Sequence, residues 1–177
     1  MHELRTANLL GAAALTIADR LRDSAAAAAG TSASGTAALI TLVGYPGLGV
    51  TELGARVGLS QPAAARMIDG LVALGLVERR AGSTGRSVAI HPTRRGRAAA
   101  ERALRAREGE LTSAIERLPA DERAALTRAL ERVLYGLFDR PGSEHVVCRL
   151  CDRGACLSAG QACPVGQAAR DRGGAHG

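Results

Sequence analysis

The chain has 177 residues, enough for one folded domain with a short appendage. Its composition is 46% hydrophobic and 23% charged, as in a globular protein, and its formal net charge of +6 favours a polyanionic partner. Only 2% of the residues are aromatic, so an aromatic platform for stacking single-stranded bases is excluded and the core must consist of aliphatic side chains.

Apolar residues between Leu4 and Leu21 recur at helical spacing and predict an amphipathic helix over about residues 3–28. Charged residues follow its apolar stretch at once, unlike a signal peptide, and no run is long enough to span a membrane. We therefore expect a cytoplasmic protein. The stretch GTSASG, residues 30–35, indicates a linker before a second helix over about residues 36–44.

Two short helices with a tight turn between them are predicted next. Thr51 is a capping residue for the first helix, which Gly58 ends. Ser60 caps the second helix, which Gly75 ends. A buried stripe runs along the second helix at Ala64, Met67, Ile68, Leu71 and Val72.

Two strands joined by a basic hairpin follow these helices. Residues 76–78 begin the first strand, residues 79–87 (RRAGSTGRS) form the hairpin tip, and residues 88–91 form the second strand. This order of elements is typical of a winged helix-turn-helix, in which one helix enters a DNA groove and a charged β-loop grips the flanking backbone.

Two further helices complete the predicted fold. Thr93 caps a long helix that reaches about Leu118, and Pro119 opens a last helix with its own apolar stripe. The terminal helices carry more apolar surface than a small DNA-binding head can cover. A two-fold dimer that matches a palindromic operator is the expected use of this surface, and packing within one chain is the alternative.

The segments LSQPAAARMIDGLVALGLVERR, GRSVAIHPTRRG and LPADERAALTRALERVL resemble the recognition helix, second wing strand and last helix of MarR-family regulators. The resemblance covers Met1 to about Arg140. It implies a mostly α fold with a small β-wing, a reading head at about residues 36–92 and long terminal dimerisation helices. One departure lies at Thr84, Gly85 and Arg86, where the family usually has Asp-x-Arg and this chain lacks the carboxylate.

The resemblance implies a homodimeric, sequence-specific DNA-binding regulator, and we expect a repressor. A small molecule, or a metal or redox signal received by the cysteine tail, is the expected effector, and a purely structural role of the tail is the alternative. Three groups of residues are the candidates for contact with double-stranded DNA. They are Gln61, Ala63, Ala64 and Arg66 for base edges, Thr51 and Ser60 for phosphates, and Arg79, Arg80 and Arg86 for the flanking backbone or minor groove.

Residues 141–177 form a tail that holds all four cysteines of the chain, Cys148, Cys151, Cys156 and Cys163, in the spacing C-x2-C-x4-C-x6-C. A zinc site with four thiolates is our first prediction, since it suits a loop with few large apolar residues. An iron–sulfur cluster, redox-switching disulfides and cysteines without a shared role are the alternatives. His145 is either a substitute ligand or a solvated histidine, and nearby arginines are expected to offset thiolate charge.

Two other classes of protein compete with a regulator. One is a redox or iron–sulfur protein whose helical part only dimerises it, and the other is an adaptor that has lost DNA binding. We expect no enzyme, because the sequence has no phosphate-binding glycine loop and no recognisable nucleophilic triad or carboxylate pair. Purified zinc protein would be colourless, whereas an iron–sulfur protein absorbs visible light.

Overall fold

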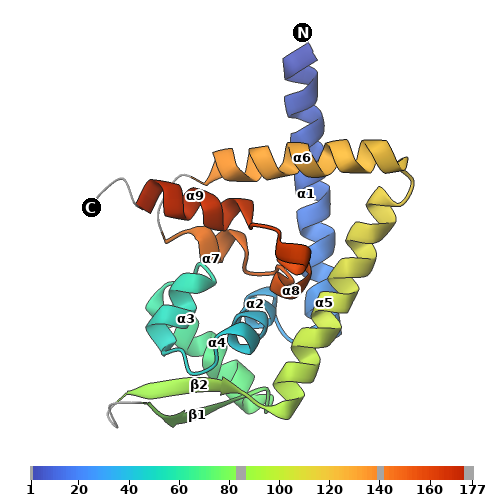
Figure 1. Ribbon diagram of the computed structural model, residues 1–177. Helices are drawn as coiled ribbons and strands as arrows, with labels where there is room; N and C mark the ends of the chain where they lie inside the picture. Colours follow the sequence, from blue (N-terminus) through green and yellow to red (C-terminus); the bar gives the residue numbers. More distant parts are fainter. Residues whose placement is uncertain (1, 83–86, 139–141, 174–177) are drawn as a thin grey trace.

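The computed structural model describes residues 2–82, 87–138 and 142–173. Helices dominate these ranges, and a single antiparallel pair of strands lies among them (Figure 1). In chain order the elements are α1 (His2–Ala29), α2 (Ala33–Gly44), α3 (Val50–Arg56), α4 (Gln61–Ala73), β1 (Val77–Ala81), β2 (Val88–Pro92), α5 (Arg94–Ile115), α6 (Ala120–Leu137), α7 (Glu144–Val147), α8 (Arg153–Cys156), the 3-10 turn η1 (Ser158–Gly160) and α9 (Pro164–Gly173). The prediction of a mostly α fold with a β-wing is confirmed.

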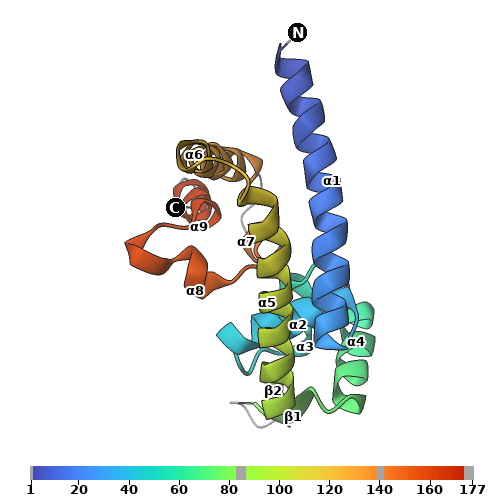
Figure 2. The same ribbon diagram turned by 90° about the vertical axis from the view of Figure 1, so that its right-hand side faces the viewer.

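Helices α1 and α5 lie side by side (Figure 2). Small side chains make this close packing possible, because Ala25, Ala29 and Ala103 are buried together between the two helices. The Arg102 Nε donates a hydrogen bond of 3.0 Å to the Ala28 carbonyl oxygen across the pair. This pair forms the scaffold from which the smaller helices and the hairpin extend.

The reading head surrounds an aliphatic core. Its largest fully buried side chains are Leu39, Leu42, Leu53, Ile68, Leu71 and Ile90, from α2, α3, α4 and β2. Burial of side chains of this size supplies most of the stability of such a domain, at about 1.5–3 kcal/mol each. Met67 is half-buried, and Val72, which we predicted to be buried, is 36% exposed.

Strands β1 and β2 pair in antiparallel register, from Val77 opposite Pro92 to Ala81 opposite Val88. The hairpin is anchored at the middle of β2, because Ile90 donates a backbone hydrogen bond of 2.9 Å to Leu48 in the loop before α3. Arg79 and Arg80 therefore lie in β1, and our placement of them in the hairpin tip is wrong. Strand pairing continues as far as Ala81, which lengthens the wing beyond the predicted strand.

Two helix starts depend on side-chain caps. The Ser32 Oγ accepts a 3.1 Å hydrogen bond from the Gly35 backbone, so α2 begins at Ala33, inside the stretch that we predicted to be a linker. The Thr93 Oγ1 accepts the same kind of bond from Gly96 at 3.1 Å, as predicted. The predicted cap at Thr51 is wrong, because Gly49 is the N-cap of α3 and Thr51 lies in its first turn.

Replacing Gly96 by Ala is expected to lower the free energy of unfolding by about 3 kcal/mol. A Cβ atom at Gly96 would lie 1.9 Å from the Leu76 carbonyl oxygen, so the chain would have to shift. The control is Gly109→Ala in the same helix, where a Cβ atom would meet nothing within 4 Å. The control should gain about 0.5–1 kcal/mol from helix propensity. Chemical denaturation followed by circular dichroism measures both, and equal stabilities would contradict this packing.

The tail packs against the rest of the chain. Helix α9 lies along α6, where Phe138 is buried with Val165 and Ala168 (Figure 1). Helix α7 contacts α3 of the reading head, and Leu150 packs against the head core. The tail therefore has apolar anchors at both ends, which the sequence analysis did not foresee.

Exposed apolar side chains are concentrated on α1 and α6. No residue of α6 is buried, and Leu130 and Leu137 are 43% and 69% exposed. Leu4, Leu9 and Leu15 of α1 are each more than half exposed. Within the described ranges, none of the single helices combines the length and apolar composition needed to cross a membrane, although α1 and α2, bent by 73°, meet the criterion as a pair.

Candidate nucleic-acid interface and cysteine site

Helix α4 has the form of a recognition helix. Ser60 is its N-cap residue, with extended φ and ψ, and its hydroxyl makes no capping hydrogen bond. Ala64, Ile68 and Leu71 face the core, whereas Gln61 and Arg66 are exposed on the outer side. Within the ranges that the structure describes, Arg66 makes no ion pair. Its guanidinium therefore remains available for a polar partner.

One of the predicted base contacts is wrong. Ala64 has no exposed surface, because its methyl group packs against Gly54 of α3 at the closest approach of the two helices. The methyl group fills a core position and cannot reach a base edge. Ala63, its neighbour, is half-buried, and Thr51 is exposed.

Ion pairs connect the wing to the recognition helix. The Arg79 guanidinium lies 2.6 Å from the Asp69 carboxylate, which joins β1 to α4. Arg80 pairs with Glu78 within the same strand. Both arginines are exposed, so each pair is worth at most about 1 kcal/mol and can exchange its carboxylate for a phosphate. Arg86 lies outside the described residues, as do Thr84 and Gly85.

The four cysteines lie together although 15 positions separate the first from the last in the sequence. Their thiols are neighbours, since Cys148 interacts with Cys151 and Cys163, and Cys156 interacts with Cys163 and Cys151. The Gly166 backbone N–H donates a hydrogen bond of 3.5 Å to the Cys163 Sγ at the start of α9. Cys156 is exposed and the other three cysteines are half-buried.

The charges around Cys148 and Cys151 separate the pKa values of the two thiols. The Cys148 thiol donates a hydrogen bond to the Cys151 sulfur, which lowers the pKa of Cys151 to about 6 and raises that of Cys148. Arg107 of α5, with Arg153 and Arg149 of the tail, also contributes to this low pKa of Cys151. Burial raises the pKa of Cys156. Cys151 is therefore largely a thiolate at neutral pH.

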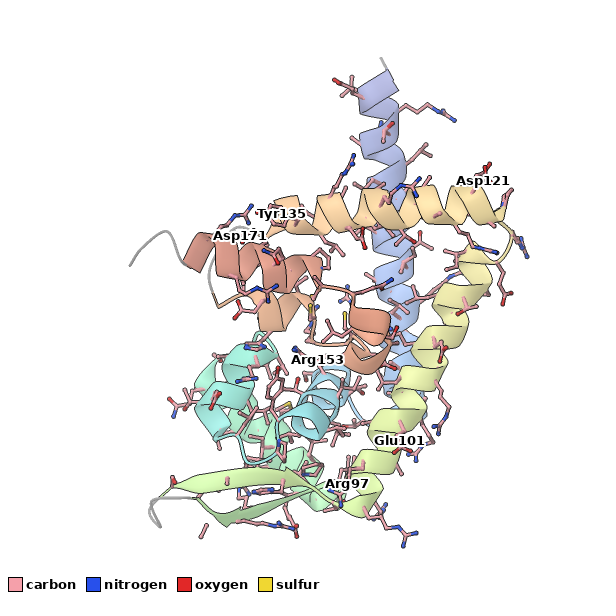
Figure 3. The ribbon with its side chains drawn as sticks, in the orientation of Figure 1. Arg97, Glu101, Asp121, Tyr135, Arg153 and Asp171 are labelled. Atoms are coloured by element: carbon pink, nitrogen blue, oxygen red, sulfur yellow. The ribbon has the colours of Figure 1, made fainter. Side chains whose placement is uncertain are left out.

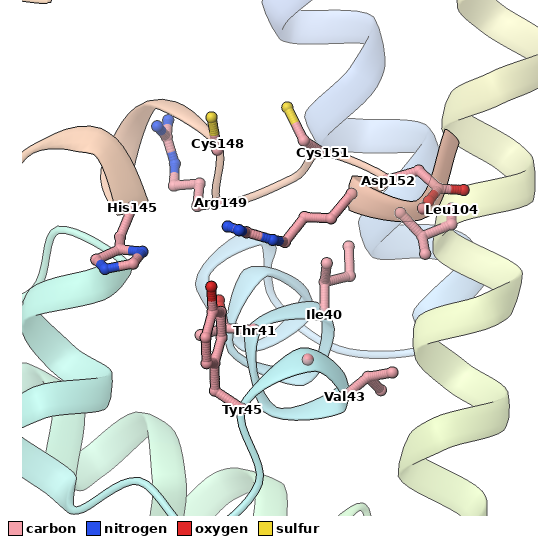
Figure 4. A pocket seen from close by; sticks show the side chains of 13 residues that line it. Ile40, Thr41, Val43, Tyr45, Leu104, His145, Cys148, Arg149, Cys151 and Asp152 are labelled. Atoms are coloured by element: carbon pink, nitrogen blue, oxygen red, sulfur yellow. The ribbon is translucent and has the colours of Figure 1, made fainter. Parts of the chain in front are cut away.

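A pocket of about 210 Å³ lies beside these thiols. Figure 4 shows Cys148 and Cys151 at one side of it, with Tyr45 and Thr41 of the reading head at the other. In the part of the chain that the structure describes, no three His, Cys, Asp or Glu side chains are already placed so that they hold a metal ion.

Alkylation of reduced, chelator-treated protein is expected to reach Cys151 first. With a pKa of about 6, roughly nine tenths of this thiol is ionised at pH 7, and the fraction falls through one half near pH 6. The raised pKa of Cys156 keeps that thiol protonated, although it is more exposed. Timed iodoacetamide labelling with peptide mass mapping from pH 5 to pH 8 measures both rates. Faster labelling of Cys156 at pH 7 would contradict the charge distribution.

The aromatic residues mark contacts that we did not predict. The chain has two tyrosines, one phenylalanine and no tryptophan, and each of the three rings contacts the tail. The Tyr135 Oη donates a 2.9 Å hydrogen bond to Asp171 of α9 (Figure 3), which raises the pKa of Tyr135. Because the sequence has so few aromatic residues, the positions of these three rings were the signal from which the contacts of the tail could have been predicted.

His145 is part of the same contact. It lies on α7 with its ring edge-on to Tyr45 at 5.9 Å, and burial together with Arg56 lowers its pKa. The sequence analysis offered two interpretations of His145, a substitute metal ligand or a solvated histidine, and neither is supported. The histidine is not a solvated loop residue, and within the described ranges it belongs to no group of side chains placed to hold a metal ion.

A short helix, a tight turn, a recognition helix and a two-stranded hairpin on one core define a winged helix-turn-helix protein. Residues 30–87 match the family model of the MarR family. A comparison with curated proteins found no match.

Solved structures with similar folds have low sequence identity to this chain. A MarR family protein from Bacillus stearothermophilus has a TM-score of 0.68 at 20% identity, covering 78% of this chain and 96% of its own. The RV1404 protein of Mycobacterium tuberculosis has a TM-score of 0.66 at 24% identity, covering 77% of this chain and 94% of its own. The Rv2887 protein of the same organism, solved in complex with DNA, has a TM-score of 0.55 at 25% identity, covering 70% and 96%.

Proposed function

We propose that this protein is a cytoplasmic, homodimeric transcriptional repressor that binds a palindromic operator through α4 and the wing. The observation that carries the proposal is the exposed outer face of α4, with Gln61 and Arg66 away from the core, next to a wing rich in arginine. The Rv2887 protein, with which this chain shares its fold, was solved in complex with DNA. No catalytic activity is part of the proposal.

A dimer follows from the same architecture. The exposed leucines of α1 and α6 need a partner, and a second copy of the chain with two-fold symmetry would cover them and place two reading heads on two half-sites. Repression would then result from occupancy of the operator, and an effector would act by binding one state of the dimer more tightly than the other.

The proposal is tested by selecting sequences from a pool of random DNA duplexes with the purified full-length protein. We expect an inverted repeat whose half-site centres lie about one helical turn apart, and a steep fall in affinity with salt. Recovery of no enriched sequence, with affinity equal for all duplexes, would contradict sequence-specific regulation. A helical redox protein that only dimerises would give that result.

Arg66→Ala is expected to weaken binding to the selected operator by about 1–3 kcal/mol and to relax the preference at one base pair of each half-site, because a bidentate guanidinium contact is lost. Arg105→Ala on α5 is the control, since this arginine is also exposed but lies outside the reading head. Fluorescence anisotropy on a panel of single-base operator variants measures the affinity and the base preference of both protein variants. Equal losses in the two variants would contradict the orientation assigned to α4.

We also propose that the four cysteines bind one metal centre per chain, with zinc as the first candidate and an iron–sulfur cluster as the alternative. Four thiols in mutual contact, with three arginines around Cys151, support it, because a zinc ion with four thiolates carries a net charge of −2 that the arginines offset. Elemental analysis and an absorption spectrum of protein purified without oxygen distinguish zinc from iron.

A further inference from the structure

Tyr45 is the centre of the contact between the cysteine tail and the reading head. It caps the C-terminal end of α2, and the Arg56 guanidinium of α3 lies 4.4 Å from its ring centroid. From the tail, Arg153 lies 5.3 Å from the same centroid and His145 meets the ring edge-on at 5.9 Å. Two elements of the head and two of the tail therefore meet on one ring.

The tail residues that contact Tyr45 lie close to the cysteines in the sequence. His145 lies three positions before Cys148, and Arg153 lies between Cys151 and Cys156 at the start of α8. Val146 lies against Gly58, in the turn that joins α3 to the recognition helix. A displacement of the cysteine loop would therefore move groups that touch α2, α3 and the turn before α4.

The opposite end of the tail is fixed to α6. Val165 and Ala168 of α9 bury Phe138, and Asp171 accepts the hydrogen bond from Tyr135 (Figure 3). The tail thus connects α6, part of the proposed dimer interface, to the reading head. In a dimer that reads two half-sites, the position of each head relative to the dimer helices sets the spacing between recognition helices, and hence the DNA affinity.

Metal binding would have to rearrange this connection. No three of the described His, Cys, Asp or Glu side chains are placed to hold a metal ion, so gathering four thiols around one ion at about 2.3 Å each requires the segment from Cys148 to Cys163 to move. Helix α8 lies inside that segment and carries Arg153. A ligand shifts an equilibrium only when it interacts differently with the two states, and this geometry supplies such a difference.

We infer that binding of Zn²⁺ to Cys148, Cys151, Cys156 and Cys163 is coupled to operator affinity through the contact of Arg153 and His145 with Tyr45. The inference deepens the proposed function and rests on it. It assigns the cysteine site the role of a sensor rather than a structural staple. Linkage requires the effect to be reciprocal, so the operator must change the affinity for Zn²⁺ by the same factor as Zn²⁺ changes the affinity for the operator.

The test compares operator dissociation constants of the reduced full-length protein in excess chelator and at one Zn²⁺ per chain. We expect at least an approximately fivefold change in the wild type, and the same factor in a Zn²⁺ titration with and without operator. Cys156→Ser should abolish the response. Tyr45→Leu should bind Zn²⁺ and operator but show no coupling, whereas Tyr135→Leu, at the other tail contact, should keep it.

Arg153→Ala removes the same contact from the tail side, and it is the second variant if Tyr45→Leu does not fold. Failure of the protein to bind operator in either metal state would count against the proposed function. Operator binding that is equally tight with Zn²⁺ and with chelator would overturn the sensor role alone. Full coupling between Zn²⁺ and operator in both Tyr45→Leu and Arg153→Ala would show that the contact at Tyr45 does not carry the coupling. Iron with visible absorbance, or disulfides that exclude Zn²⁺ from the reduced protein, would overturn the assignment of zinc.

Discussion

Leu130→Asp is expected to convert the proposed dimer into a folded monomer, with a dimer dissociation constant raised about 100-fold or more. Leu130 is 43% exposed in the single chain, and no residue of α6 is buried there, so the substitution leaves the core of the chain intact. In the dimer the same position would lie between two copies, where an unpaired carboxylate carries a large desolvation cost. Light scattering across a concentration series measures the change.

Leu74→Asp is the matched control for this substitution. Leu74 is 45% exposed, close to the value for Leu130, but it lies at the end of α4 on the reading head. It should remain dimeric with an unchanged dissociation constant. A wild-type protein that is monomeric at micromolar concentration would remove the dimer from the proposal. Because Leu130 is exposed in the single chain, we expect a folded monomer and not an aggregated or unfolded product.

Much of the reading head could be predicted from the sequence because its signals are local. Ser60 and Thr93 precede helices at the predicted positions, and Gly75 ends α4 with a φ of +65°. The errors also have local causes. Ser32 caps a helix inside a stretch whose small residues resemble a linker. Helical spacing placed Ala64 correctly in the buried stripe, and the error was to assign the same residue to base contact.

The arrangement of the tail could not be predicted in the same way. Helices α7 and α8 have four residues each, too short for a periodic pattern. Their positions depend on Tyr45 and Arg56, about a hundred residues earlier in the chain. The cysteine spacing predicted a shared role for the four thiols, and their mutual contact agrees with that. The spacing carried no information about which surface the loop would touch.

The final prediction concerns metal content. Cys156→Ser is expected to reduce bound metal from one per chain to a small fraction of that, because a site of three thiolates and a hydroxyl binds a soft ion much more weakly. Cys156 is the exposed member of the group, so its replacement removes a ligand without opening a cavity. Native mass spectrometry of protein purified without oxygen measures the stoichiometry. Gln161→Ala, an exposed change in the same loop, should keep the metal.

Loss of the metal should expose only part of the tail to protease. The segment between α7 and α9 has few apolar contacts, so coordination would supply most of its order. Helix α9 should resist cleavage, because Val165 and Ala168 are buried around Phe138 whether or not metal is present. Limited proteolysis should therefore cut Cys156→Ser between residues 148 and 163 and leave the head intact. A wild-type mass equal to the bare chain, with all four thiols freely alkylated in the folded protein, would rule out the metal centre and the sensor together.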